Sequence, residues 1–553
     1  MKAPMRRLSI TLLLIFSTFG GAPVWADLPQ SQPERWGRYV EACVNTLIER
    51  GADRYGEVHS PMLMTVLDVR TLDSPQDPPV LDSLVRLEGR IHRRGERGSN
   101  LWHDQPVLSA MYELSERTNN SKYAQAADDY VRYALEHCRK ENGLLVWGTH
   151  IYWDCYNERA AGDDDGRGPH EILVHRAAWP AMYRVAPEGV KQEIDLIWEH
   201  HVHNKETGRH NRHDYGHPGA DFPFSAGTYI QAFAFMESVA PDEEAAEYLR
   251  RAKLVTDWHW NQRNPETNLV AFEPGNLLYN REDWDFYGET FASAVTGPHA
   301  AQLLRSYELT GDVHFRDVAV AYLLAYDKYG WDEAKQTFVG MLNLDGQVTS
   351  VADVPAGMRS QLAGGANEPD PNYSVPPIGP VDIWPTTIYP LDFPLLTAQS
   401  TILAYEQTPA DDSATRAGLL QAARHWATAI EAALPPQPGR TFQHTFFAAL
   451  PEARETGGTY AANYGRAISF FTHLYRATQE QRYLDVAHQL AQDAVDKLYV
   501  ETELTDAQGA PRRYGIFKGH PAKPYYETVD GVGFLLLALL ELDRPNTPSP
   551  GAF

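Results

Sequence analysis

The chain has 553 residues, of which 43% are hydrophobic, and carries a formal net charge of −24. This length and composition are ample for a large hydrophobic core, and the negative charge argues against nucleic acid as a partner, because phosphate binding needs a basic surface. The three cysteines, Cys43, Cys138 and Cys155, allow at most one bridge, so the chain does not rely on a disulfide framework.

The N-terminal residues have the pattern of a secretory signal peptide. Lys2, Arg6 and Arg7 precede an apolar run at 8–19 that is too short for a stable membrane span, and small residues follow at the two positions that define a cleavage site. We therefore expect cleavage after Ala26 and a periplasmic or secreted mature protein. No later apolar run reaches membrane-spanning length, so we expect no membrane span.

Paired amphipathic helices are predicted for most of the remaining chain. The segments 111–127, 306–319 and 474–487 share one pattern, in which a helix and a short polar turn precede an aromatic residue that opens a second helix. Strand-like alternation is scarce. After a signal peptide of residues 1–26, we predict one all-α domain over residues 27–543, whose helical hairpins close into an α/α toroid; an open solenoid is the alternative.

Two stretches interrupt the helical pattern. Residues 335–390 contain many prolines and glycines, and residues 501–524 form a second irregular insertion. A long ordered loop of this kind is often a lid or the wall of a cleft, so we expect the insertions to shape the binding site. The proline-rich residues 544–553 are predicted to be a disordered tail.

The stretch 147–218 holds an unusual density of imidazoles, carboxylates and arginine. Packing does not require such polarity, so it indicates chemistry. Our hypothesis is a metal site made by His150, Glu171 and His213, with Arg212 beside it. Imidazole and carboxylate donors without a thiolate suit Mn, Fe, Co, Ni or Zn, and three protein ligands leave positions open for water or substrate.

Each of these ligands also has an ordinary structural interpretation. They are 21 and 42 residues apart in the chain, which is not a compact metal-binding motif. His150 fits a turn, Glu171 fits the N-terminus of a helix opened by Pro169, and His213 fits a loop. Other histidines of the same stretch compete for the ligand roles, namely His170, His175, His210 and His217.

Arg212 next to a metal ion is electrostatically unusual unless both cations face an anion between them. The carboxylate of a uronic acid is such an anion, and its neutralisation makes the proton on the adjacent carbon more acidic, as β-elimination requires. The alternative for Arg212 is a structural salt bridge to Asp214 or Asp221.

The order and spacing of His150, Glu171, Arg212 and His213 resemble the site of the pectate lyases of polysaccharide lyase family 2. The resemblance extends to three further segments, at 53–61, 142–150 and 525–533. It implies an α/α barrel of about seven helical hairpins. It also implies that the chain cleaves polygalacturonate or a similar polymer by metal-assisted β-elimination.

The resemblance implies a role for each candidate residue. His150, Glu171 and His213 would bind a divalent metal, with manganese favoured and nickel, cobalt or zinc as alternatives. Arg212 would be the Brønsted base that removes the proton. The substrate would be an acidic polysaccharide or oligouronide, and the protein would be a monomer or a homodimer.

Other bases and other functions stay open at this point. An arginine is almost always protonated, so a tyrosinate or a lysine is an alternative base, with Tyr152, Tyr287 and Lys328 as candidates. A glycoside hydrolase on the same fold is the alternative function, and a non-catalytic sugar-binding protein with an aromatic cleft is a third. The hydrolase would need two carboxylates, drawn from Asp104, Asp154, Asp285 and Glu289.

Overall fold

The computed structural model describes residues 35–75, 95, 97–173, 177–219, 221–271, 274, 290–339, 341–348, 392–435, 456–505 and 509–547. The predicted signal peptide, most of the 335–390 insertion and the last six residues of the predicted tail lie outside these ranges. Within them, no helix combines the length and the apolar composition needed to cross a bilayer.

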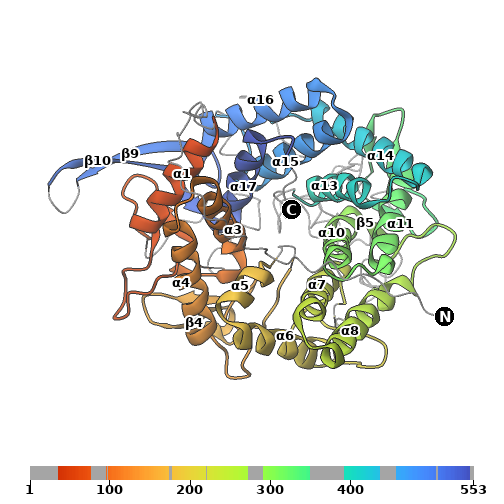
Figure 1. Cartoon of the computed structure of the whole chain (residues 1–553), viewed down its shortest axis with the longest axis horizontal. Coiled ribbons are helices and arrows are strands. Elements are labelled where there is room, and N and C mark those ends of the chain that lie inside the picture. Colours follow the sequence, from red (N-terminus) through yellow and green to blue (C-terminus); the bar gives the residue numbers. More distant parts are fainter. Residues whose placement is uncertain are drawn as a thin grey trace, which may run out of the picture. The chain divides into compact units, whose positions relative to one another are not determined.

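Seven pairs of helices dominate the described chain, one helix of each pair in an inner layer and one in an outer layer (Figure 1). The inner helices are α3 (Leu101–Thr118), α5 (Trp179–Val185), α7 (Pro223–Val239), α10 (Ser293–Thr310), α13 (Asp392–Gln407), α15 (Ala461–Thr478) and α17 (Val532–Asp543). The outer helices are α4 (Lys122–His137), α6 (Pro187–His201), α8 (Asp242–Trp260), α11 (Val313–Gly330), α14 (Ser413–Ala432), α16 (Gln481–Leu498) and α1 (Gly37–Thr46), which packs beside α17.

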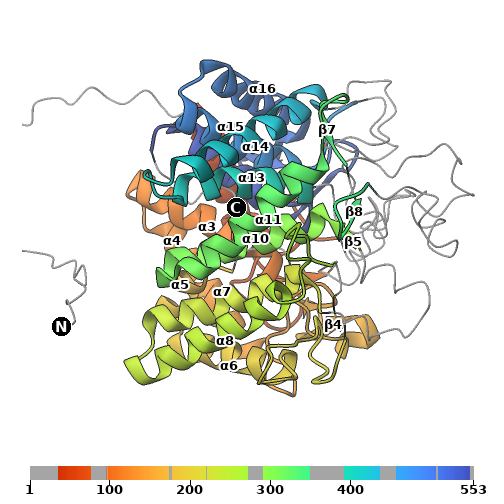
Figure 2. The ribbon, with the colours of Figure 1, turned by 90° about the vertical axis from the view of Figure 1, so that its right-hand side faces the viewer.

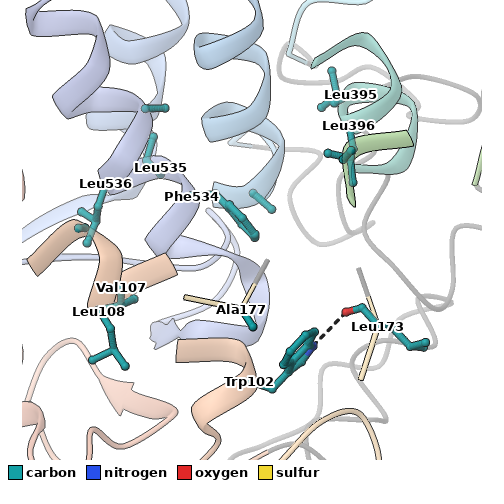
Figure 3. Packing of buried hydrophobic residues seen from close by; sticks show 14 of the residues in the cluster. Trp102, Val107, Leu108, Leu173, Ala177, Leu395, Leu396, Phe534, Leu535 and Leu536 are labelled. Atoms are coloured by element: carbon teal, nitrogen blue, oxygen red, sulfur yellow. Dashed lines mark hydrogen bonds between the residues drawn. The ribbon is translucent and has the colours of Figure 1, made fainter. Parts of the chain in front are cut away.

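The inner helices form a closed ring. Helix α7 packs against α10, α10 against α13, α13 against α15, α15 against α17 and α17 against α3, while α5 contacts α4, α6 and α7. At the seam, Leu535 and Leu536 of α17 lie beside Val107 and Leu108 of α3 (Figure 3). A Cβ on Gly533 would lie 2.5 Å from the backbone nitrogen of Val107, so only glycine permits this approach. The predicted α/α toroid is confirmed, and the open-solenoid alternative is wrong.

Hydrogen bonds also join the last inner helix, α17, to the first helix of the chain, α1. The carboxylate of Asp543, at the end of α17, accepts from the backbone N–H groups of Trp36 at 3.0 Å and Gly37 at 2.6 Å. These amides open α1, where the first N–H groups of a helix have no partner within the helix and the helix dipole favours a negative charge. The last helix of the ring therefore caps the first helix of the chain.

Burial distinguishes the inner layer from the outer layer. Along α7 every residue from Pro223 to Met236 is buried, as expected for a helix that has neighbours on all sides. Helix α16 instead buries a single stripe at helical spacing, which includes Tyr483, Ala487 and Leu490. This difference explains why amphipathic periodicity is clearer in the outer helices than in the inner ones.

Short antiparallel strands connect the helices, and Figure 2 shows β4, β5, β7 and β8 gathered at one end of the ring. This is the end at which the inner helices begin, so the segments that precede α5 and α7 lie there too. The paired strands are β1 (Val66–Asp68) with β11 (Tyr525–Glu527), β2 (Gly98–Ser99) with β3 (Ile151–Asp154), β3 with β4 (Arg159–Gly162), β5 (Thr290–Ala292) with β8 (Met341–Asn343), and β6 (Trp331–Asp332) with β7 (Thr337–Phe338).

The prediction of an irregular insertion at 501–524 is wrong for much of its length. Strands β9 (Tyr499–Thr505) and β10 (Pro511–Phe517) form an antiparallel hairpin in which Tyr499 pairs with Phe517. Exposed and partly buried residues alternate along β9, as a strand with one solvated face requires. The three cysteines are all free and buried, so the one bridge that the sequence allows does not form.

A buried ionic cluster fastens the opposite ends of α13, α15 and α17. His473 lies 2.9 Å from Glu406 and 2.7 Å from Glu541, while Arg476 and the Ser469 hydroxyl also reach Glu541. Burial alone would lower the pKa of His473, but the charges of Glu541 and Glu406 outweigh it and raise that pKa to about 9. His473 is therefore charged at neutral pH and bridges two inner helices.

We expect this cluster to make stability depend on pH. Because the pKa of His473 in the folded chain lies above its ordinary value of 6.5, the proton stabilises the fold fully below pH 6.5. That contribution, on the order of 3 kcal/mol, disappears as the pH rises through about 9. Urea unfolding from about pH 6 to 10 should show the gap between wild type and His473→Gln shrinking with pH. The exposed His137→Gln is the control, and a gap that does not change with pH contradicts the assignment.

Candidate metal centre

Two extended segments bring His150 and Glu171 together. Gly148 forms a parallel β-bridge with Glu171, and the backbone N–H of Thr149 donates to the Glu171 carbonyl at 3.0 Å. Gly148 has a φ of +108°, and a Cβ there would lie 2.1 Å from the Glu171 carbonyl oxygen. Only glycine fits this position, and it holds the segment that leads into β3 directly beside Glu171.

The three predicted ligands lie within reach of a single ion. One ligand atom from each of His150, Glu171 and His213 lies within 4.8 Å of the other two. His150 Nε2 is 2.9 Å from Glu171 Oε2, His213 Nε2 is 3.4 Å from Glu171 Oε1, and the two imidazole rings meet edge to face. The three residues are 8%, 1% and 7% exposed, so the donors are shielded from bulk water.

This donor set fits a divalent cation. Neither nitrogen of the buried His213 side chain forms a hydrogen bond within the described residues, and the same holds for His150 Nε2. Buried polar atoms normally have a partner, so atoms of this kind that face a carboxylate mark a place for an ion. Two imidazoles and a carboxylate, with no thiolate, suit Mn, Fe, Co, Ni or Zn. In the described part of the chain, no other group of three such side chains is close enough to share a metal.

Two neighbouring side chains orient the ligands. Asp163 Oδ2 lies 2.7 Å from His150 Nδ1, which places the ring proton on Nδ1 and leaves Nε2 as the donor atom towards Glu171. The Thr149 hydroxyl donates to Glu171 Oε2. Carboxylates and hydroxyls in such places fix the direction of metal ligands.

Arg212 lies against the same carboxylate. Its Nε is 3.2 Å from Glu171 Oε1, and its guanidinium lies 5.1 Å above the centre of the Phe222 ring. Arg212 thus forms a salt bridge, as the alternative held, but with a different partner. Asp214 pairs with Lys140 at 2.7 Å, and Asp221 contacts Trp258 at 2.7 Å and Arg209 at 3.8 Å. Glu171 is distant in sequence from Arg212 but adjacent in space, whereas Asp214 points away to a different partner.

The protonation states of Glu171 and His213 suit metal coordination, whereas a metal would have to compete with a proton on His150. Burial would raise the pKa of Glu171, but Arg212 and His150 hold it well below its usual range. Burial and the charge of Arg212 lower the pKa of His213 to about 4. Burial also opposes protonation of His150, but the charge of Glu171 raises its pKa above the ordinary value. At neutral pH the carboxylate is ionised and His213 is neutral, the forms that bind metals.

The alternative bases are poorly placed. Tyr152 is buried, and that burial, with the charge of Asp154, raises its pKa to about 12. Lys328 lies on the outer helix α11, where its ammonium packs over Tyr329. Tyr287 lies outside the described residues.

The carboxylates proposed for a hydrolase have structural roles where they are described. Asp104 is fully buried in α3 and accepts a hydrogen bond from Tyr130 at 2.5 Å. Asp154 is fully buried and pairs with Arg97 at 2.7 Å. Asp285 and Glu289 lie beyond the described ranges. The two described candidates, Asp104 and Asp154, are therefore both occupied by structural partners.

Of the competing histidines that the structure describes, none belongs to the group that could share a metal. His170 and His210 are fully buried and bonded to other partners, His217 is exposed, and His175 is not among the described residues. The sequence interpretation missed Thr149 and Asp163. The acidic run that begins at Asp163 was a usable signal, since a carboxylate often supports a histidine ligand; nothing in the sequence distinguishes Thr149.

Comparison with known proteins agrees with this site. A family model described as periplasmic pectate lyase matches residues 91–242, which include His150, Glu171, Arg212 and His213. A pectate disaccharide-lyase of Dickeya dadantii (strain 3937) is 23% identical over 338 residues, covering 53% of this chain and 58% of that relative. The chain therefore matches less than two thirds of the length of this curated relative.

Among solved structures, a D-mannose isomerase covers 93% of this chain and 100% of its own at a TM-score of 0.47 and 10% identity. A sugar epimerase from a ruminal bacterium covers 79% of this chain and 99% of its own at a TM-score of 0.46 and 12% identity. The sequence matches are the informative ones, and they confirm that the chain resembles the pectate lyases of polysaccharide lyase family 2.

Proposed function

We propose that this protein is a polysaccharide lyase that cleaves an acidic, uronate-containing polysaccharide by metal-assisted β-elimination. One observation carries the proposal. The donor atoms of His150, Glu171 and His213 converge in a buried site, and the Arg212 guanidinium lies 3.2 Å from the same Glu171 carboxylate. A dication held here carries more positive charge than Glu171 neutralises, so the site is suited to a second anion, and a uronate carboxylate is one.

In the proposed reaction, a metal would neutralise the substrate carboxylate and Arg212 would remove the proton. A divalent metal held by the three ligands would neutralise the uronate carboxylate and so increase the acidity of the C5 proton. We assign removal of that proton to Arg212 in its neutral form, whose own proton goes to solvent beforehand because a dication at the three ligands would disfavour a second positive charge nearby. The electron pair of the C5–H bond then forms the C4–C5 double bond as the C4–O bond breaks, the departing oxygen takes a proton from solvent, and no water is consumed. The carboxylate of Glu171 orients the guanidinium through its Nε atom.

The comparison supports a substrate class and a location, and the donor set supports a choice of metals. The curated relative is named for pectate, so pectate is the first polymer to consider, with other uronate polymers or oligouronides next. Manganese is the first metal, and nickel, cobalt or zinc can occupy the same donors. The family description and the predicted signal peptide both support a periplasmic or secreted protein.

The ligand assignment predicts loss of metal without loss of fold. We expect His150→Ala, Glu171→Ala and His213→Ala each to weaken manganese binding by more than the roughly 100-fold that changes in supporting residues cause. Dialysis followed by elemental analysis measures the metal, and circular dichroism checks the helices. His217→Ala removes an exposed imidazole from the same loop and should bind metal normally. A triad variant that keeps full metal occupancy removes that residue from the site.

The reaction itself can be tested by absorbance. Purified mature protein mixed with pectate should give a steady near-ultraviolet rise, because β-elimination creates a double bond conjugated with the carboxylate. A chelator should abolish the rise, and manganese should restore it. A neutral polysaccharide, which has no uronate, should give none. New reducing ends without the rise would show hydrolysis and overturn the proposal.

Arg212→Lys separates the base from the metal site. The lysine keeps a positive charge but loses the planar guanidinium that pairs with a carboxylate, so we expect turnover to fall roughly 10²–10⁴-fold. Manganese affinity should stay close to wild type, because Arg212 is not a ligand. Turnover like that of wild type would exclude the proposed role, and the same assay with a series of uronate polymers would rule out a changed substrate preference.

A further inference from the structure

A row of buried polar side chains lies behind the metal ligands. It consists of Trp147, His170, His201 and Tyr229, all fully buried. They come from four segments: the loop before β3, the residue before Glu171, the end of α6 and the second turn of α7. None of them is a candidate ligand, yet burying two imidazoles is costly unless both ring nitrogens of each are satisfied.

The hydrogen bonds along this row have a fixed direction. The Trp147 indole nitrogen can only donate, and it lies 2.7 Å from His170 Nε2, so the ring proton of His170 is on Nδ1. That Nδ1 lies 2.7 Å from His201 Nε2, which must accept, so the proton of His201 is also on Nδ1. Glu193 Oε1 lies 3.3 Å from His170 Nε2, farther than the indole nitrogen. In this order each imidazole donates from Nδ1 and accepts at Nε2.

The row ends on the backbone that carries Arg212 and His213. His201 Nδ1 lies 2.8 Å from the Tyr229 hydroxyl oxygen and 3.1 Å from the Asn211 carbonyl oxygen. The Tyr229 hydroxyl in turn donates towards the Arg212 carbonyl at 3.2 Å or that of Asn211 at 3.3 Å.

Each anchor of the row is close in sequence to a ligand. Trp147 stands three residues before His150, His170 immediately precedes Glu171, and the carbonyl of Arg212 immediately precedes His213. One continuous set of hydrogen bonds therefore links all three ligand-bearing segments from behind.

We infer that His170, His201 and Tyr229 are positioning residues, a hydrogen-bonded chain that sets the separation of the three ligand segments and so the affinity for a divalent metal. Apolar side chains of the same volume would fill the space but would not fix distances to a few tenths of an ångström, whereas a chain with one donor and one acceptor at each step does. The inference rests on the metal centre of the proposed function.

The test uses full-length protein stripped of metal and titrated with manganese in a calorimeter. Tyr229→Phe removes one hydroxyl, and His201→Leu removes the central imidazole. We expect both to bind manganese roughly 10–100-fold more weakly than wild type. His201→Gln, whose amide both accepts and donates, should recover part of the loss. Tyr322→Phe is the matched control, since it removes another buried tyrosine hydroxyl, on α11, and should leave the affinity unchanged.

The outcomes separate this inference from the proposed function. If Tyr229→Phe and His201→Leu melt at lower temperature but bind manganese as wild type does, the row is only structural and the inference fails while the lyase proposal stands. If wild type binds no divalent metal, the proposed function fails, and this inference fails with it. Imidazole nitrogen NMR of the metal-free protein tests the row separately, because an Nε2–H form of either histidine would break the row and overturn the inference.

Discussion

The buried charge of Glu171 is the constraint on which the site depends. An ionised carboxylate that is 1% exposed is costly unless charges and hydrogen bonds surround it. Arg212, the Thr149 hydroxyl and two imidazoles provide that surrounding, and they come from separate segments that must all converge on one side chain. The polar density of the stretch 147–218 follows directly from this requirement.

The toroid brings these separate segments together although they are far apart in the sequence. The inner helices begin at one end of the ring, so the segments that precede α5 and α7 are neighbours there although they are far apart in sequence. Rigid helices hold the ends of these segments, and the β-bridge at Gly148 aligns the two that carry His150 and Glu171. The helical layers thus fix the positions of the connecting segments, and these segments carry the residues of the candidate site.

The sequence predicts most of the architecture, because hairpin repeats and amphipathic outer helices are local patterns. It also groups His150, Glu171, Arg212 and His213, partly from polar density and partly from a family resemblance. It does not predict which residues from distant parts of the chain come into contact. The sequence placed Arg212 beside the ligands, with a bridge to a nearby aspartate as the alternative, but gave no sign that it would pair with Glu171 itself. His201 and Tyr229 look like ordinary residues of α6 and α7. The β9–β10 hairpin was missed because its alternation is short and lies among turn-forming residues.

The hydrogen bonds between the Asp543 carboxylate and the start of α1 have a consequence for how the chain folds. The carboxylate and the amide of Trp36 are 507 residues apart, so the first helix lacks its cap until nearly the whole chain has been synthesised. The seam between α3 and α17 is equally long-range. Contacts of this separation form late, since the entropy of closing the loop must be overcome first. Capping of α1 and closure of the ring therefore both require α17, and we expect them to be late steps of folding.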